Sequence, residues 1–270
     1  MVMNWDGTVH PLTTLFPQIQ PPADWCSGCG LGIVWQALLR AISTLKDPRG
    51  QSDVDDCQLL ISGLGCLGLI NKLSPLQVNQ ASPEKLGEQA FKIAQHNQPK
   101  KVVILASEPD ILVGGIKALL PANINLSNKD LEGTVLTLFI NSGLSLVYSI
   151  SKGPVPLAHL PPSEQKMLVN LPWRARQQGV EAVSRWTSLH VRRLTRAIKM
   201  ALTKAKGFYL IEVISPCLMI WADRKKLGES LPRMNWLQRM AVINLAASVA
   251  EMDLSSGERF VIGHVRQDGD

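Results

Sequence analysis

Four of the five cysteines stand where the sequence predicts a loop next to a strand or a helix. Cys26 and Cys29 form a C-x-x-C pair directly before a helical stretch. Cys66 follows one short apolar strand and Cys217 follows another. Four thiolates from one such pair and two distant loops suit either tetrahedral zinc or a cubane iron–sulfur cluster. The small glycines beside them let backbone N–H groups approach the sulfurs, which favours a [4Fe-4S] cluster held in a nest of amides.

The other candidates for chemistry are weaker. A C-x-x-C pair by itself also occurs as a redox dithiol or as two small buried residues. Cys57 lies at the start of a strand after an acidic turn, and we interpret it as a partly buried structural thiol. The five histidines are scattered, and Ser142-Gly143 lacks the pattern of a hydrolase nucleophile, so the sequence assigns no catalytic residue.

Short unbroken apolar strands alternate with helices of suitable periodicity, and these elements must position the cysteines. The expected strands cover residues 59–61, 101–105, 134–140, 208–214 and 260–264, and the expected helices cover residues 31–45, 83–96, 111–120, 190–204 and 234–252. This alternation predicts an α/β fold with a doubly wound, mostly parallel sheet covered on both faces. Ligands of such sheets bind at loops that leave the C-terminal ends of strands, which is where the cysteines lie.

The length of 270 residues fits one large domain with appended segments. We expect a proline-rich, irregular leader over 1–24, an α/β domain with the metal site over 25–232, and a C-terminal helix and strand of the same domain over 233–270. A content of 46% hydrophobic and 19% charged residues excludes a disordered chain, and five cysteines are too few for a disulfide scaffold. No stretch reaches the roughly 20 apolar residues of a membrane span. We therefore expect a cytoplasmic protein without a membrane partner.

Positive charge is concentrated in one part of the chain, although the formal net charge is only +6. Between Arg174 and Lys206, nine lysines and arginines stand against one acid, Glu181. Such a basic segment is typical of a solvated helix face, or of a surface that meets an acidic protein, an anionic substrate or nucleic acid. No nucleic-acid motif accompanies the basic segment, so we expect no nucleic-acid partner.

Three segments together resemble the beta subunits of the 2-oxoacid:ferredoxin oxidoreductases. Trp25-Cys26-Ser27-Gly28-Cys29-Gly30 is similar to the family's W-C-P-G-C-G, with Ser27 in place of the usual proline. Ile61-Ser62-Gly63-Leu64-Gly65-Cys66 resembles its S-G-I-G-C segment. Lys206-Gly207-Phe208 and the following residues up to Ser215-Pro216-Cys217 resemble its H-K-G-F…V-x-S-P-C ending. The three matches occur in order and span roughly residues 25–220.

The resemblance implies the pyrophosphate-domain fold of thiamine diphosphate enzymes and a single [4Fe-4S] cluster beside that cofactor. The cluster ligands carried over from the family are the cysteine set, which is Cys26, Cys29, Cys66 and Cys217. It also implies a hetero-oligomer, in which an alpha-type subunit supplies the other half of any thiamine site. Ferredoxin or another acidic electron carrier would take the electrons, and the basic segment is a candidate dock for either partner.

The thiamine half departs from the family pattern G-D-G-D-x-L-x-x-G-G, whose first Asp holds Mg²⁺ against the cofactor diphosphate. The matching residues run from Ala106 to Gly115 and put Ser107 at the metal-binding position, while Glu108 and Asp110 offer a carboxylate only in a shifted register. The family's second metal segment, an N-N pair, reads Asn141-Ser142, and its H-G-R segment has no counterpart around residues 80–83. Mg²⁺ prefers hard oxygen ligands such as carboxylates. We therefore expect altered or lost thiamine chemistry in this altered region, which is Ser107, Glu108, Asp110, Asn141 and Ser142.

Two functional hypotheses follow. In the first, the chain is a beta-type oxidoreductase subunit whose [4Fe-4S] cluster transfers electrons. In the second, it is a non-catalytic assembly subunit in which the cluster, or zinc on the same thiolates, only stabilises the fold. Iron and acid-labile sulfide analysis discriminates between the two hypotheses.

Overall fold

An eight-stranded sheet forms the centre of the computed structural model, which describes residues 25–26, 29–45, 55–95, 101–121, 131–143, 168–217, 230–255 and 259–266. The strand order is β2-β1-β3-β4-β6-β5-β8-β7, and neighbours are parallel except for the antiparallel pair of β5 and β8. The strands are β1 Cys57–Ile61, β2 Gln77–Gln80, β3 Lys101–Ser107, β4 Thr134–Asn141, β5 Ala182–Thr187, β6 Gly207–Ile214, β7 Ala241–Ile243 and β8 Phe260–His264.

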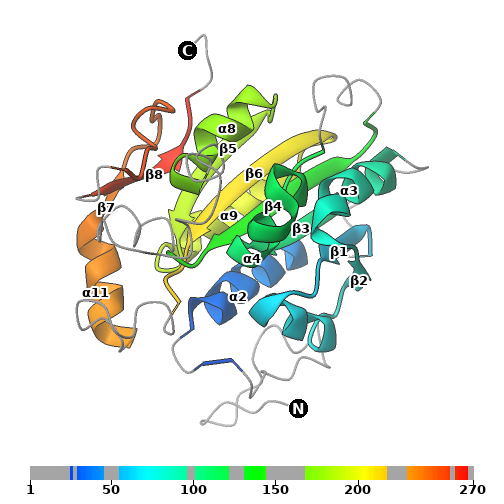
Figure 1. Ribbon diagram of the computed structural model, residues 1–270, viewed down its shortest axis with the longest axis horizontal. Helices are drawn as coiled ribbons and strands as arrows, with labels where there is room; N and C mark the ends of the chain where they lie inside the picture. Colours follow the sequence, from blue (N-terminus) through cyan, green and yellow to red (C-terminus); the bar gives the residue numbers. More distant parts are fainter. Residues whose placement is uncertain are drawn as a thin grey trace.

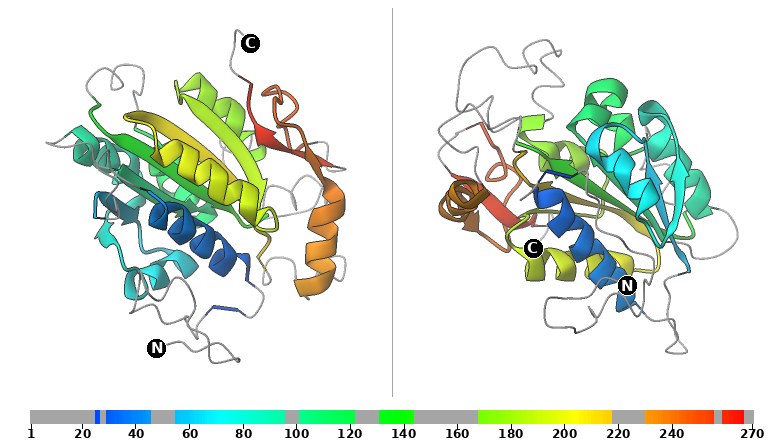
Figure 2. Two further views of the ribbon diagram at one scale, coloured as in Figure 1. Left: turned by 180° about the vertical axis from the view of Figure 1, so that it is seen from behind. Right: turned by 90° about the horizontal axis from the view of Figure 1, so that it is seen from below.

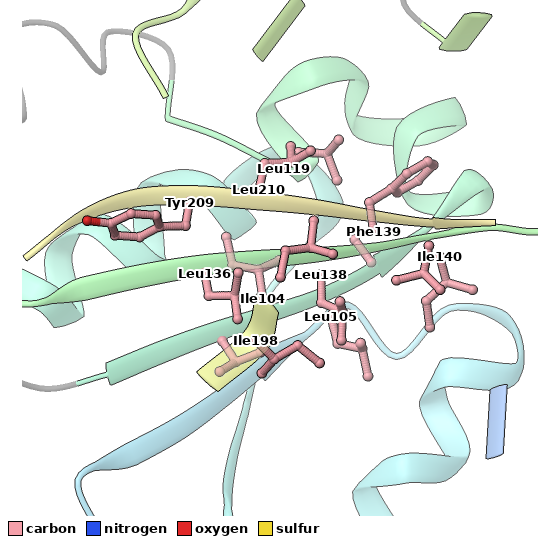
Figure 3. Close-up of a cluster of buried hydrophobic side chains, with 14 of the residues drawn as sticks. Ile104, Leu105, Leu119, Leu136, Leu138, Phe139, Ile140, Ile198, Tyr209 and Leu210 are labelled. Carbon is pink, nitrogen blue, oxygen red and sulfur yellow. The ribbon is translucent and has the colours of Figure 1, made fainter. Parts of the chain in front are cut away.

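The central strands are buried and mostly apolar because helices cover both faces of the sheet. Every residue of β4 and β6 is buried. Side chains from β3, β4 and β6 meet in one cluster, to which helix α9 contributes Ile198 (Figure 3). This packing holds the ends of β3, β4 and β6 at one edge of the sheet, and that edge carries the site.

Helices form a layer on each side of the sheet. Helices α2 (Gly30–Ser43) and α9 (Val191–Leu202) lie side by side on one face, as Figure 2 shows from behind. Helices α3 (Leu86–Gln95), α4 (Glu108–Gly114) and α8 (Leu171–Gln177) cover the other face (Figure 1). Helix α11 (Ser230–Met240) stands outside the sheet, toward the end at which β6 finishes. This arrangement confirms the expected α/β fold with a mostly parallel, doubly wound sheet.

The predicted strands are confirmed, but three further strands escaped prediction. β2 is rich in amides and β5 contains Ser184 and Arg185, so neither has a continuous apolar run. The expected helix over 234–252 is wrong beyond residue 240, because Ala241–Ile243 form β7 and pair with β8. The expected helix over 111–120 begins earlier, at Glu108, and continues from Gly115 to Ala118 as a 3₁₀ helix.

The expected leader over 1–24 lies outside the described residues, and the boundary between residues 232 and 233 stays a prediction. Among the helices that the structure describes, none combines the length and the hydropathy that crossing a bilayer requires.

Candidate functional site

The cysteine set is placed by three connections at the carboxyl edge of the sheet. Cys26 and Cys29 precede α2, Cys66 lies in the 3₁₀ helix Gly65–Lys72 after β1, and Cys217 lies in the loop after β6. Cys26 and Cys66 are exposed, and Cys29 and Cys217 are half-buried. The structure therefore brings the four predicted ligands to one edge, with part of the set open to the surface.

Backbone hydrogen bonds hold the three connections. The Cys29 N–H donates to the Cys26 carbonyl at 2.9 Å, which closes the C-x-x-C turn. The Trp25 indole N–H donates to the Cys66 carbonyl at 3.1 Å and joins this turn to the loop after β1. The Cys217 N–H donates to the Ser142 carbonyl at 2.8 Å. The thiols themselves take no part in these bonds, so the backbone sets their positions and the sulfurs stay available.

Gly30 allows the start of α2 to approach the loop after β6. A Cβ atom at this position would collide with the Ser215 hydroxyl and would crowd the side chain of Ser188. A larger residue here would require the Ser215 side chain to move, so glycine lets these segments pack closely as they stand. Gly65 has a positive φ of 58°, a conformation that glycine adopts readily, and it turns the chain directly before Cys66.

The four thiols lie within electrostatic range of one another. Burial raises the pKa of the Cys29 thiol, and the charges of Cys217, Cys66 and Cys26 raise it further, while a hydrogen bond with the Leu31 backbone acts the other way. Burial also raises the pKa of Cys66, followed by the charges of Cys217 and Cys26. Burial and the neighbouring thiols therefore both disfavour the thiolate form of Cys29 and of Cys66.

Within the described parts of the chain, no three His, Cys, Asp or Glu side chains converge closely enough to hold one metal ion, and this includes the cysteine set. Four thiolates on one zinc ion lie about 3.8 Å apart, since each sulfur is about 2.3 Å from the metal in a tetrahedron. In a cubane cluster each thiolate binds a different iron, so the sulfurs stand farther apart. The arrangement of the described thiols is therefore not that of a preformed site for one metal ion.

A cavity of about 230 Å³ joins the cysteine set to the altered region. Its lining includes three of the four cysteines and side chains from the ends of β3 and β4, together with apolar residues. The lining residues are Cys29, Leu31, Gly65, Cys66, Leu67, Ser107, Glu108, Pro109, Leu112, Ile140, Ser142, Ser215 and Cys217. The two halves of the predicted site are therefore walls of one space.

The side chains of Ser107 and Asp110 form hydrogen bonds that cap the start of α4. The Asp110 carboxylate accepts the Ser107 N–H at 2.8 Å and the Ser107 hydroxyl at 3.2 Å, and Ser62 donates to it as well. These contacts form a capping box that begins α4 directly after β3. Asp110 is fully buried and does not line the cavity. Asp110, one of the two acids in the shifted register, therefore serves as part of the helix cap.

Glu108 is the acid of the altered region that does line the cavity, and its side chain is 1% exposed. Ser142 lines it too, next to the loop that holds Cys217. Asn141 points elsewhere: its amide donates to Glu212 at 2.7 Å, and its side-chain oxygen accepts the Gly143 N–H at 2.9 Å. Of the five predicted residues, Ser107, Glu108 and Ser142 line the cavity, whereas the side chains of Asp110 and Asn141 form hydrogen bonds within the protein.

A buried ion pair supports this edge of the sheet, and the sequence analysis missed it. Arg185 of β5 donates to Glu212 of β6 at 2.7 Å, and both side chains are fully buried. Arg185 also donates to the Met252 carbonyl at 2.5 Å. Glu212 in turn holds Asn141, whose backbone carbonyl accepts the Ser215 N–H at 2.8 Å. The one signal in the sequence was two opposite charges inside short apolar strands, because such charges are buried only when paired.

The basic segment does not form one surface. Arg185 is the buried partner of Glu212, and Arg176 donates to the carbonyls of Val180 and Glu181 from α8. The exposed cations of α9, which are Arg192, Arg193, Arg196 and Lys199, lie on the opposite face of the sheet from α8 (Figures 1 and 2). A dock for an acidic partner would therefore use the α9 part of the segment alone.

Comparison with known proteins finds relatives that align over most of the chain. No family model matches the sequence. The chain is 25% identical over 267 residues to 2-oxoglutarate synthase subunit KorB of Methanocaldococcus jannaschii, covering 94% of this chain and 91% of that protein. It is 26% identical over 208 residues to the beta subunit of 2-oxoacid:ferredoxin oxidoreductase 1 of Aeropyrum pernix, covering 73% of this chain and 59% of that one.

The fold agrees with these relatives. A solved 2-oxoglutarate:ferredoxin oxidoreductase from Magnetococcus marinus superposes with a TM-score of 0.64 over 94% of this chain and 84% of that one, at 14% identity. That structure contains 2-oxoglutarate, coenzyme A and succinyl-CoA. In sequence the chain is thus similar to beta subunits of the 2-oxoacid:ferredoxin oxidoreductases, and it shares its fold with the solved 2-oxoglutarate:ferredoxin oxidoreductase.

Proposed function

We propose that this beta-type subunit carries a [4Fe-4S] cluster on Cys26, Cys29, Cys66 and Cys217 and serves electron transfer. The observation that supports it is the convergence of four free thiols from three separated connections at the ligand-binding edge of the sheet. A bound cluster would accept and release one electron at a time. The chain's own part is to hold the four sulfurs by backbone contacts and to leave Cys26 and Cys66 at the surface, where an electron can leave.

We also propose that Mg²⁺–thiamine diphosphate chemistry is altered or lost in this chain. Ser107 offers a metal only a neutral hydroxyl in place of a carboxylate, and the side chains of Asp110 and Asn141 are already used within the protein. Glu108 places a buried carboxylate in the cavity, where it would repel a diphosphate without a metal. The residues present do not fit the magnesium-held cofactor, so we derive no step through it.

The partners follow from the family. We infer an alpha-type subunit as the obligatory neighbour and ferredoxin or another acidic carrier as the electron acceptor. The exposed cations of α9 would attract an acidic carrier, and this attraction would weaken with salt. Free cysteines at all five positions suit the reducing conditions of the cytoplasm.

The cluster is tested by iron and acid-labile sulfide analysis of the native complex, purified without oxygen. We expect four irons and four sulfides per chain. The variant Cys66→Ser should lose them, whereas Cys57→Ala should keep them, because Cys57 is buried in β1 away from the cysteine set. Zinc without sulfide would overturn the electron-transfer role and support a structural assembly subunit.

The altered region is tested by calorimetric titration of the same complex with thiamine diphosphate and Mg²⁺. We expect no saturable binding in this subunit's pocket while the cluster remains intact. Saturable binding that Glu108→Gln or Ser107→Ala weakens would show that the pocket still takes the cofactor.

A further inference from the structure

One face of the molecule carries charge of a single sign. Helices α2 and α9 form that face, and neither of them contains an acidic residue. The exposed cations on it are Arg40 of α2 and Arg192, Arg193, Arg196 and Lys199 of α9. Protein surfaces usually intersperse the two signs, whereas a field of one sign attracts partners of the opposite charge.

Three of these cations follow one line along α9. Arg192, Arg196 and Lys199 are spaced four and three residues apart, and we call them the cation stripe. Like charges at this spacing repel one another, and no acidic residue of the described chain pairs with them. Arg193 lies outside the stripe, because its guanidinium is held over the ring of Trp186, 5.9 Å from the centroid. No contact within the described chain therefore accounts for the charges of the cation stripe.

The cation stripe begins beside the cysteine set. Only Ser188, Leu189 and His190 separate the end of β5 from the start of α9. Ser188 lies so close to Gly30 that a Cβ atom on this glycine would come within 2.9 Å of the serine hydroxyl oxygen. Gly30 begins α2 and directly follows Cys29. Because α2 and α9 lie side by side (Figure 2), their amino-terminal ends are neighbours at the edge of the sheet that carries the cysteines.

The chemistry of this face favours a protein as the partner. Neither helix exposes an aromatic side chain on which the bases of a nucleic acid could stack. Leu194, Ile198 and Leu202 of α9 are buried in the core, so the helix has no apolar face to place in a membrane surface. Met200 is 50% exposed beside Lys199, and methionine is enriched at protein interfaces. Obligate interfaces are more apolar than this face, whereas complementary charge suits a partner that binds and leaves.

We propose that Arg192 and Arg196, the amino-terminal part of the cation stripe, form the docking surface for an acidic electron-carrier protein, an inference that rests on the proposed cluster. Carboxylates of the carrier would pair with the two guanidiniums, which would hold the carrier beside the turn that contains Cys29. One electron then passes from the reduced cluster to the carrier, and no covalent bond forms or breaks. The cations farther along the two helices raise the rate of encounter through their long-range field but do not position the carrier.

The test compares two double variants that remove the same charge. Arg192→Gln/Arg196→Gln neutralises the proposed dock, and Arg40→Gln/Lys204→Gln neutralises two exposed cations about 15–18 Å farther along the two helices. The native complex is reduced with dithionite, desalted without oxygen and mixed in a stopped-flow instrument with a ferredoxin of net negative charge. We expect the second-order rate constant at low salt to fall about tenfold in the first variant and less than about threefold in the second. Both differences should shrink toward 1 M salt, where the Debye length is about 3 Å.

The control is oxidation of the reduced cluster by 1,4-benzoquinone, a small neutral acceptor, whose rate should be the same in wild type and both variants. Equal losses of the ferredoxin rate in the two variants would overturn the dock, because the cations would then act only through their long-range field. Unchanged rates in both variants would overturn it as well and would make the stripe a solvated face. A single-stranded oligonucleotide that binds more tightly than the ferredoxin, and less tightly to the first variant, would assign the stripe to nucleic acid.

The inference and the proposed function can fail separately. Wild-type complex without iron and sulfide would overturn the proposed cluster. Calorimetric titration of that complex with the same ferredoxin would then decide the dock, because binding requires the surface but not the cluster. Binding that is weaker in Arg192→Gln/Arg196→Gln than in Arg40→Gln/Lys204→Gln would support the dock, and equal binding would overturn it.

Discussion

The cysteine set and the altered region line one cavity but use their polar atoms in different ways. Around the described cysteines, hydrogen bonds join backbone to backbone or Trp25 to backbone, and one thiol, that of Cys29, is hydrogen-bonded to the Leu31 backbone. In the altered region, the side chains of Ser107 and Asp110 cap a helix and the side chain of Asn141 binds Glu212. Polar groups that the fold already uses are poorly placed to bind a ligand. The polar side chains of the altered region are therefore part of the scaffold to a greater extent than the thiols of the cysteine set.

The contrast between the two regions would fail if the buried polar contacts around the altered region did not stabilise the fold. Glu212→Gln leaves Arg185 buried without its counter-charge, and removing one partner of a buried pair costs about 3–5 kcal/mol of unfolding free energy. Urea unfolding of the purified chain after iron chelation would measure it. Glu88→Gln is the matched control, because Glu88 pairs with Lys92 on the surface, where solvent screens an ion pair and it contributes little to stability. Equal effects of the two variants would refute the structural role.

The capping box should show an intermediate effect. Ser107→Ala removes the hydroxyl that Asp110 accepts and part of the cap of α4, so we expect a loss of about 0.5–2 kcal/mol in the same urea assay. Iron and sulfide content should stay at the wild-type level, because Ser107 is not among the cysteine ligands. A loss of iron without a loss of stability would place Ser107 in the ligand-binding half instead.

Asp110 predicts a pH dependence of stability. Burial raises the pKa of Asp110, while hydrogen bonds with Ser62 and Ser107 partly oppose this shift. A folded-state pKa above the unfolded value means that the native state binds the proton more tightly. This contribution is fully present below the unfolded pKa and is lost as pH rises through the folded pKa. The difference in unfolding free energy between wild type and Asp110→Asn should therefore change over this acidic window and level off above it. A flat difference would count against the shift.

The smallest effect on stability is expected for the cysteines themselves. Cys66 is exposed, so Cys66→Ser should change the unfolding free energy of the iron-free chain by less than about 0.5 kcal/mol, although it should abolish iron binding. Thermal melts with and without bound iron would separate the two effects. A large loss of unfolding free energy in the iron-free Cys66→Ser chain would mean that the thiol packs as part of the fold. The two regions would then not differ in the way described above.

The sequence predicted the parts of this site that depend on local signals. Each cysteine follows a recognisable apolar strand or precedes a helix, so its place at the edge of the sheet could be inferred. β5 could not be inferred, because Arg185 interrupts its apolar run and is tolerated only through Glu212 on β6. The helix over 234–252 ends at Met240 because Ala241–Ile243 pair with β8, a partner that helical periodicity does not reveal.

The spread of the cysteine set along the chain has a consequence for biosynthesis. The first of the four cysteines is Cys26 and the last is Cys217. A ribosome must therefore release most of the polypeptide before the four sulfurs can meet. Loading of the proposed cluster would accordingly be a late event, after Cys217 has been synthesised and β6 has joined the sheet.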